Sequence, residues 1–248
     1  MLILLDVGNT AVTCGLFKSG RLAGFRSAQY INIPKLINKW SKSGDLNNID
    51  VIISSVVPKI TLFLKKALKA ENTRIWVVGS SLKVPVKHRY KKASSLGIDR
   101  IINAYGGLRM YKTPLLIIDF GTAITFDYVS SKKIFEGGMI IPGPELSFQT
   151  LCARAAGLPH KARLPVKAKS FLGTSTHDCL SSGILEGYGA MTEGLINRFK
   201  ARFGKKLKVI ATGGFAKTLS RYTRGFDKID PAHSIKSLRL LYKETFKR

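Results

Sequence analysis

The chain contains one short pattern twice, and this duplication limits the folds that it can adopt. Residues 4–14 read Leu-Leu-Asp-Val-Gly-Asn-Thr-Ala-Val-Thr-Cys, and residues 117–126 read Ile-Ile-Asp-Phe-Gly-Thr-Ala-Ile-Thr-Phe. In both copies an apolar run that we expect to be a strand ends in Asp-x-Gly, and a second strand follows. The aspartates, Asp6 and Asp119, are 113 residues apart, whereas the Thr-Ala-x-Thr segments are one residue out of step. The pattern predicts two similar lobes, with a ligand site between them that holds both carboxylates.

Each half of the chain repeats a similar order of predicted elements. In the first half we expect strands at 2–6, 12–17, 22–27, 51–57 and 75–78, and helices at 33–42, 60–70 and 100–111. In the second half we expect strands at 115–119, 124–129, 134–141 and 207–211, a long helix at 177–203, a helix from Phe215, and a C-terminal helix at 235–246. Strands that alternate with helices indicate an α/β fold with mixed sheets covered by helices. We place the N-terminal lobe at 1–113 and the C-terminal lobe at 114–248.

Composition narrows the class of protein. The 248 residues suffice for one large or two small domains. No apolar run approaches the ~20 residues that span a bilayer, so we expect no membrane partner. The three cysteines are an odd number without close spacing, which favours a reducing compartment and hence the cytoplasm.

The net charge of +26 is extreme and unevenly placed. Eight basic residues and one acid lie between Lys83 and Lys112, and no acid occurs from Leu146 to His177. Such a field attracts anions, including small substrates such as ATP, although a lysine-rich solvated surface explains it equally well. We do not expect a nucleic-acid partner, because no recognition motif accompanies the charge.

The first Asp-x-Gly copy, residues 6–10, has the residue types of a phosphate-binding turn. Glycine allows a close backbone approach, and the N–H groups with the Asn9 and Thr10 side chains can donate to phosphate oxygens. A carboxylate at this position suits Mg²⁺, which prefers oxygen ligands. An ordinary β-turn has the same composition. The presence of two matching copies favours the functional interpretation.

Two further segments carry possible chemistry. Residues 212–214, Thr-Gly-Gly, follow a predicted strand and open a predicted helix, a junction that can present N–H groups to a nucleotide but is also common in α/β folds. Asp99 lies at a predicted helix start, where it can serve as an N-cap. Alternatively, Asp99 is a general base beside an anion-binding arginine, Arg100, as a kinase requires.

Together these segments resemble the type III pantothenate kinases, a branch of the superfamily that includes actin, heat-shock chaperones and sugar kinases. The resemblance covers most of the chain. It also rests on an ordered set of motifs: Ser54-Ser55-Val56-Val57-Pro58, Tyr90 seven residues before Gly97, Asn103-Ala104, Gly137-Gly138 with Pro142-Gly143, and Ala211-Thr212-Gly213-Gly214. It implies a duplicated actin-like ATPase fold with ribonuclease H-like lobes, and ATP-dependent phosphorylation of pantothenate, the first step of coenzyme A biosynthesis. It also implies a cytoplasmic homodimer.

The resemblance assigns roles residue by residue. Asp99 would be the catalytic base, and the pantothenate site would comprise Tyr90, Gly97, Ile98, Asp99, Arg100 and Thr176. The ATP site would comprise Asp6, Val7, Gly8, Asn9, Thr10, Ala11, Val12, Thr13, Thr122, Gly213 and Gly214. Asp6 would lie on the Mg²⁺ side of the phosphates, and Asp119 would bind a monovalent cation, K⁺ or NH₄⁺.

The chain departs from the family pattern at some positions. Lys91-Lys92 follows Tyr90 where family members often have Asn-Pro, residues 26–29 replace an acidic Thr-rich stretch, and a C-terminal glycine is replaced around residues 236–237. Two other functions stay open: a kinase of the superfamily that acts on a different small alcohol, and a non-catalytic transcriptional accessory regulator on the same fold.

Overall fold

The computed structural model describes residues 1–41, 49–69, 73–158 and 163–246. The chain divides into two compact units, unit 1 with Met1–Met110 and Ala232–Arg248, and unit 2 with Tyr111–Pro231. Helix α7 (His233–Phe246), which we expected in the C-terminal lobe, belongs to unit 1.

Unit 1 contains a mixed five-stranded sheet, as the sequence predicts. Its strands are β1 (Leu2–Val7), β2 (Val12–Lys18), β3 (Arg21–Ala28), β4 (Ile49–Ser55) and β5 (Thr73–Val77), in the order β3-β2-β1-β4-β5. Strand β1 pairs antiparallel with β2 and parallel with β4. Strand β1 is therefore paired on both sides along its whole length, and Asp6 lies near its carboxyl end.

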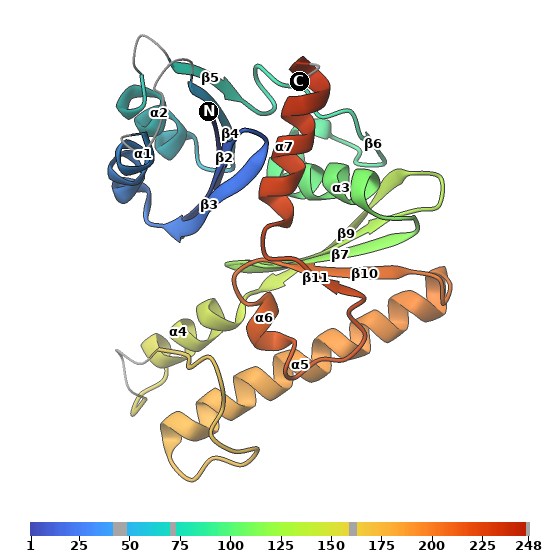
Figure 1. Ribbon diagram of the computed structural model, residues 1–248. Coiled ribbons are helices and arrows are strands. Elements are labelled where there is room, and N and C mark those ends of the chain that lie inside the picture. The colour runs from blue at the N-terminus through green and yellow to red at the C-terminus, as the bar shows by residue number, and fades with distance from the viewer. Residues whose placement is uncertain (42–48, 70–72, 159–162, 247–248) are drawn as a thin grey trace. The chain divides into compact units, whose positions relative to one another are not determined.

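Helices cover both faces of this sheet (Figure 1). These helices are α1 (Ile33–Ser41), α2 (Pro58–Ala67), α3 (Ile98–Met110) and α7. Unit 1 also contains the 3₁₀ turns η1 (Tyr30–Asn32) and η2 (Ala93–Ser95) and the short strand β6 (Lys87–His88). Ile3 and Leu5 pack with α1 and α2, whereas Leu2 and Leu4 pack with α3 and α7. Because successive strand residues face opposite sides, Asp6 shares the α3 and α7 face with Leu2 and Leu4.

Helices α3 and α7 approach each other closely. A Cβ atom at Gly106 on α3 would overlap the side chain of Ser237 on α7, so a glycine is required for this packing. The buried His233 ring contacts the Asn103 carbonyl oxygen through Nε2 at 2.9 Å. These contacts place the first turn of α7 near the carboxyl end of β1.

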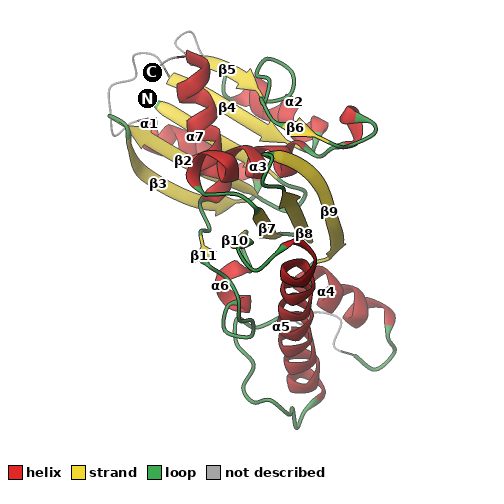
Figure 2. Cartoon of the chain, turned by 90° about the vertical axis from the view of Figure 1, so that its right-hand side faces the viewer, coloured by secondary structure: helices red, strands yellow, loops and turns green. Residues whose placement is uncertain are grey.

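Unit 2 repeats the strand arrangement of unit 1. Its strands β7 (Leu115–Phe120), β8 (Ala123–Val129), β9 (Ile134–Pro142), β10 (Lys208–Thr212) and β11 (Lys228–Ile229) follow the order β11-β10-β7-β8-β9. Helices α4 (Pro144–Arg154), α5 (Thr176–Phe203) and α6 (Ala216–Leu219) pack on one face, where Leu116, Ile118 and Phe120 form the core (Figure 2).

The duplication predicted from the sequence is confirmed by the strand order. β7 has the same neighbours as β1, with β8, β9, β10 and β11 in the positions of β2, β3, β4 and β5. Val7 pairs with Val12 across residues 8–11, whereas Phe120 pairs with Ile124 across residues 121–123. The first turn is therefore one residue longer, which explains why the two Thr-Ala-x-Thr segments are out of step.

The predicted order of elements needs two corrections. We expected no helix between the strand at 134–141 and the helix at 177–203, but α4 begins at Pro144, where the fixed φ angle and missing N–H of proline are tolerated. The helix expected from Phe215 is only the four residues of α6.

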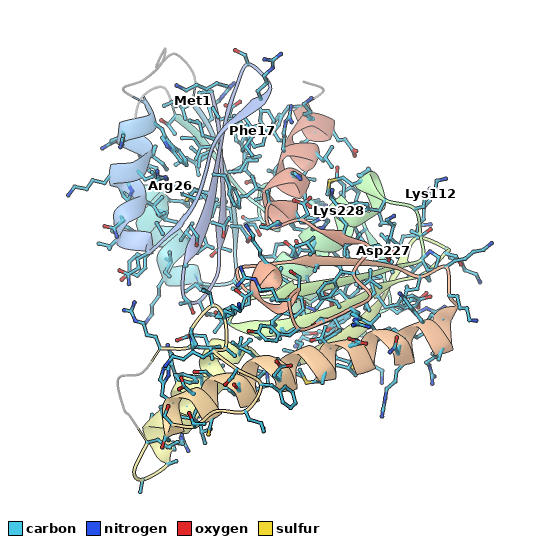
Figure 3. All side chains as sticks on the ribbon, turned by 60° about the horizontal axis from the view of Figure 1, so that its bottom comes forward. Met1, Phe17, Arg26, Lys112, Asp227 and Lys228 are labelled. Carbon is cyan, nitrogen blue, oxygen red and sulfur yellow. The ribbon has the colours of Figure 1, made fainter. Side chains whose placement is uncertain are left out.

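The charged side chains lie mainly outside these cores. Arg26, Lys112 and Lys228 are examples of exposed basic side chains on both units (Figure 3). Within the described ranges, no helix combines the length and apolarity needed to cross a membrane.

Candidate active site

The first Asp-x-Gly turn connects strands β1 and β2. Asp6 lies opposite Thr13 on β2 and Ser54 on β4. The Gly8 N–H donates to the Ala11 carbonyl oxygen at 3.1 Å, so this amide is used to close the turn. Asn9 and Thr10 are exposed at its tip. The exposed side chains of the turn are therefore those of Asn9 and Thr10.

The side chains of the other residues in the predicted ATP segment are less exposed. Val7 and Val12 are buried in the core of unit 1. Any contact from them to a nucleotide would come from the backbone. Ala11 and Thr13 are half-buried.

Asp6 has an unusual electrostatic environment. Burial raises the pKa of its carboxyl to about 6, a hydrogen bond from Ser234 opposes this shift, and the negative charge of Asp99 adds to it. Ser234 is on α7 and Asp99 is on α3. Two predicted site carboxylates therefore lie close enough in unit 1 to repel each other, an arrangement that a cation would relieve.

Asp99 is inside helix α3 and is not its N-cap. The helix begins at Ile98, and the Asp99 carboxylate accepts a hydrogen bond from the Arg100 backbone N–H at 2.8 Å. A Cβ atom at Gly97 would lie 2.5 Å from Asp99 Oδ1. The glycine thus leaves room for the carboxylate at the start of the helix.

Arg100 and Tyr90 meet beside Asp99. Arg100 is buried, and its Nη1 donates to the Tyr90 hydroxyl oxygen at 2.5 Å. Its guanidinium carbon also lies 5.6 Å from the centre of the Tyr90 ring. The structure thus brings Tyr90, Gly97, Ile98, Asp99 and Arg100 together in unit 1, with Lys91-Lys92 leaving the Tyr90 contact intact.

The second Asp-x-Gly turn has a matching frame in unit 2. Asp119 lies opposite Thr125 on β8 and Thr212 on β10, as Asp6 lies opposite Thr13 and Ser54. Each aspartate is thus flanked by hydroxyl residues on both neighbouring strands. Thr122 is exposed in the turn.

Two glycines pack directly on this second turn. A Cβ atom at Gly143 would lie 2.5 Å from the Gly121 carbonyl oxygen and 2.6 Å from that of Thr122. Gly213 has a φ of 89°, and a Cβ atom there would overlap Asp119 Oδ1 and lie 2.7 Å from the Phe120 backbone. Side chains at either position would displace the Asp119 turn.

The predicted nucleotide contact at Gly213 and Gly214 cannot rest on a helix N-terminus, as the sequence suggested. Helix α6 is only one turn, so it does not provide the helix N-terminus that the sequence suggested. Gly213 instead fits the backbone against Asp119, and a Cβ at Gly214 would meet nothing within 4 Å.

Thr176 is the first residue of α5 and is exposed. Ser175 caps this helix by accepting a hydrogen bond from the Asp178 N–H at 3.2 Å. Thr176 is in unit 2, whereas Tyr90 and Arg100 are in unit 1. Its place in one pocket with them stays a prediction.

Comparison with known proteins decides the family. The family model described as type III pantothenate kinase matches residues 2–198. The chain belongs to the type III pantothenate kinase family. The matched range contains both Asp-x-Gly turns, the Tyr90 to Arg100 segment and Thr176, and ends before Gly213 and Ser234.

Solved structures share the fold at low sequence identity. A Campylobacter jejuni protein assigned to the Baf family of transcriptional activators is 18% identical with a TM-score of 0.58, covering 99% of this chain and 98% of that one. A protein assigned as a 2-dehydro-3-deoxygalactonokinase from Sinorhizobium meliloti is 11% identical with a TM-score of 0.63, covering 100% and 98%. Component A of (R)-2-hydroxyglutaryl-CoA dehydratase from Acidaminococcus fermentans is 14% identical with a TM-score of 0.54, covering 100% and 99%. The likeness confirms the actin-like ATPase fold.

The family implies a kinase that uses ATP with a divalent metal, and the residues of unit 1 fit that group. Within the described part of the chain, no three or more His, Cys, Asp or Glu residues gather as a metal site. Mg²⁺ on ATP does not need such a cage, because it keeps waters and phosphate oxygens as ligands. The Asp6 carboxylate, already crowded by the charge of Asp99, is a suitable oxygen ligand on the protein side.

Sequence reasoning missed several residues of these frames. The Ser54 hydroxyl is buried opposite Asp6 and has no hydrogen-bond partner among the described residues. Alignment of the two repeats by strand would have paired Ser54 with Thr212. Asp127 is buried and accepts a hydrogen bond from Thr125 at 2.9 Å. The contact of Ser234 with Asp6 could not be predicted, because nothing in the sequence links Ser234 to a turn 228 residues earlier.

Proposed function

We propose that the chain transfers the γ-phosphoryl group of ATP to the primary hydroxyl of pantothenate, giving 4′-phosphopantothenate and ADP in the first step of coenzyme A biosynthesis. The observation that carries the proposal is the grouping of Asp6, Asp99 and the Arg100–Tyr90 pair at one end of unit 1. A phosphate turn, a carboxylate and an anion-binding guanidinium are what this transfer needs. The family match supports the same substrate.

In the proposed reaction the substrate hydroxyl oxygen attacks the γ-phosphorus as the bond to the ADP oxygen breaks. Asp99 accepts the hydroxyl proton, and Arg100 holds the pantothenate carboxylate. Tyr90 fixes the direction of the Arg100 guanidinium through its hydroxyl. When bound with ATP, the divalent ion would neutralise phosphate charge, with Asp6 as its protein ligand. Positioning and charge neutralisation would supply most of the acceleration.

The remaining roles belong to the same proposal. Thr122, Gly213 and Gly214 would complete the ATP site, Thr176 would line the pantothenate site, and Asp119 would bind K⁺ or NH₄⁺. The position of Asp119 between Thr125 and Thr212 supports a cation there, because carboxylate and hydroxyl oxygens are hard ligands. A cytoplasmic homodimer is also part of the proposal.

An ADP-release assay tests this function. We expect release that depends on pantothenate, exceeds that with glucose or other small alcohols, and falls when K⁺ is replaced by Na⁺. Faster release with another alcohol would point to a different kinase of the superfamily. Equal rates in K⁺ and Na⁺ would remove the cation role of Asp119 without affecting the substrate assignment.

A non-catalytic transcriptional accessory role is the second candidate, and the net charge of +26 favours it. The carboxylates Asp6, Asp99 and Asp119 argue against it, because a non-catalytic regulator needs neither a general base nor carboxylate ligands for cations. Salt-dependent binding to DNA together with no ADP release from pantothenate and ATP would reverse the ranking.

A further inference from the structure

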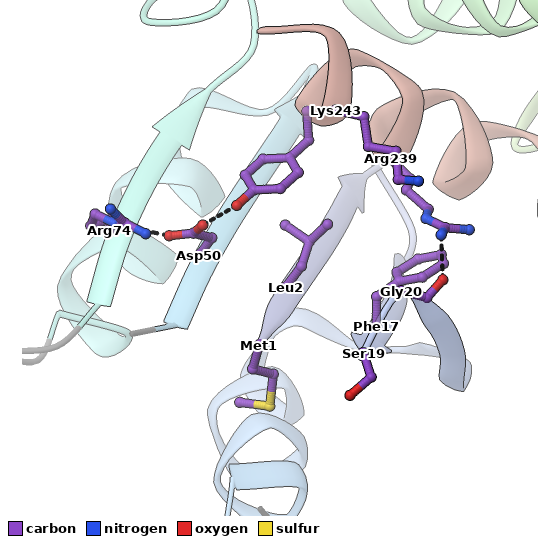
Figure 4. A pocket seen from close by; sticks show the side chains of 10 residues that line it. Met1, Leu2, Phe17, Ser19, Gly20, Asp50, Arg74, Arg239 and Lys243 are labelled. Carbon is purple, nitrogen blue, oxygen red and sulfur yellow. Dashed lines mark hydrogen bonds and ion pairs between the residues drawn. The ribbon is translucent and has the colours of Figure 1, made fainter. Parts of the chain in front are cut away.

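Unit 1 contains a pocket that the proposed function does not use. It has a volume of about 390 Å³ and is open at the edge of the sheet where β1 and β4 begin (Figure 4). Its walls come from these strands, from the turn after β2, from β5 and from the last turns of α7. Asp6 is four residues from Leu2 along β1, which is about 13 Å at roughly 3.3 Å per residue. The pocket and the phosphate turn are thus at opposite ends of one strand.

A buried and fully paired carboxylate forms one wall of this pocket. Asp50 is only 3% exposed and accepts hydrogen bonds from the Tyr242 hydroxyl and, at 2.8 Å, from Arg74 Nε. A buried charge is stable only when it is paired in this way. The pairing fixes Arg74 and Tyr242 in place, and the Arg74 charge offsets that of Asp50.

Two further cations, Arg239 and Lys243, line the pocket. Arg239 donates to the Gly20 carbonyl oxygen and lies 4.7 Å over the Phe17 ring. Lys243 is exposed, and its neighbour Glu244 pairs instead with Arg109 at 2.7 Å. Within the described chain, neither Arg239 nor Lys243 has an ion pair.

Charge and shape together define a ligand class. The charged side chains of the lining, Arg74, Arg239 and Lys243 less Asp50, carry a net charge of +2 (three minus one). A phosphate monoester is close to a dianion at neutral pH, since its second pKa is about 6. Leu2, Phe17 and the Tyr242 ring supply an apolar surface beside these cations. We propose that this pocket binds a small phosphorylated molecule with an aromatic or apolar group, at a site separate from the Asp6 turn.

Trp76 offers a local readout for this proposal. Its ring lies 5.6 Å from the Arg74 guanidinium carbon and 6.5 Å from the Tyr242 ring, and both of these residues line the pocket. The chain has two tryptophans, so Trp40→Phe leaves Trp76 as the single reporter. Titration of this variant with phenyl phosphate should change the Trp76 fluorescence saturably, both with and without saturating Mg·ATP. Phenol, which lacks the phosphate, should give no saturable change.

Charge-removing variants locate the binding. Arg239→Gln with Lys243→Gln should weaken phenyl phosphate binding at least tenfold, and Lys243→Gln alone, at an exposed position, by several-fold. Lys65→Gln on exposed α2 removes the same charge elsewhere in unit 1 and should leave the affinity within twofold. Circular dichroism verifies that each variant is folded.

Three results would overturn the site. One is an absence of saturable binding by the wild-type pocket at millimolar phenyl phosphate. Another is unchanged affinity in the folded Lys243→Gln and double variants. The third is competition by Mg·ATP, which would place the phosphate at the Asp6 turn instead.

Discussion

Asp6 is a residue whose ionisation destabilises the folded chain. Its pKa in the folded chain is about 6, above the 3.8 of an unperturbed aspartate. The folded state therefore holds a proton more tightly than the unfolded state, and the free energy of unfolding falls as the pH rises from about 4 to about 6. Above that range the loss is constant. The charge that the proposed phosphate site requires thus destabilises the protein in the absence of metal and nucleotide.

Replacement of Asp6 by asparagine should remove this loss. In metal-free and nucleotide-free protein, Asp6→Asn should raise the free energy of unfolding at pH 8 by about 1–3 kcal/mol, and at pH 4 by much less. Urea unfolding at both pH values measures the difference, and ADP release should be lost in the same variant. An increase that is equal at pH 4 and pH 8 would show that ionisation of Asp6 is not its cause.

Gly97 is the residue whose lack of a side chain leaves Asp99 in place. Gly97→Ala should push the Asp99 carboxylate aside, because the new Cβ would lie 2.5 Å from Oδ1. We expect turnover to fall at least tenfold with little change in stability, since a flexible side chain can move. Gly183→Ala on α5 is the matched control, because its Cβ meets nothing within 4 Å. Equal turnover in the two variants would contradict the role given to Gly97.

At the scale of elements, the strands were the most predictable part. β1, β4, β7 and β10 are buried runs bounded by turn residues, so their periodicity and position agree with the structure. Helix α4 was missed because it begins at the last residue of Pro142-Gly143-Pro144, a segment that is equally typical of a loop. Helix α6 was overestimated because Thr-Gly-Gly resembles a longer helix start. In both cases tertiary packing decides the outcome.

The packing of α7 on α3 depends on one glycine and one serine. Gly106→Ala would place a methyl group on Ser237, and such overpacking should lower the free energy of unfolding by about 1–3 kcal/mol. Ser237→Gly in the same chain should recover part of this loss, although glycine in a helix costs up to about 1 kcal/mol by itself. Urea unfolding of the four chains of a double-mutant cycle measures the coupling. Strict additivity would show that the two helices do not depend on this contact.

At the scale of the whole molecule, duplication explains the fold but not the difference between the two turns. The repeated strand order and the hydroxyl-flanked aspartates follow from two similar sequence halves. The asymmetry comes from what packs on each turn: Ser234 and Asp99 near Asp6, and Gly143 and Gly213 on the Asp119 turn. The motifs predicted Asp6, Asp99 and Asp119 as site residues. Ser234 belongs to no motif, and it lies near the other end of the sequence.

The central claim is that Asp99 is the base of a pantothenate kinase, and Asp99→Asn tests it most directly. The amide keeps the size of the side chain but cannot accept the hydroxyl proton, and general base catalysis typically contributes about 10²–10⁴-fold. Pantothenate-dependent ADP release and the Kd for Mg·ATP should be measured on the same preparation. The account predicts that turnover falls by at least 100-fold while the Kd for Mg·ATP stays within about threefold of the wild-type value. Turnover equal to that of the wild type would contradict it.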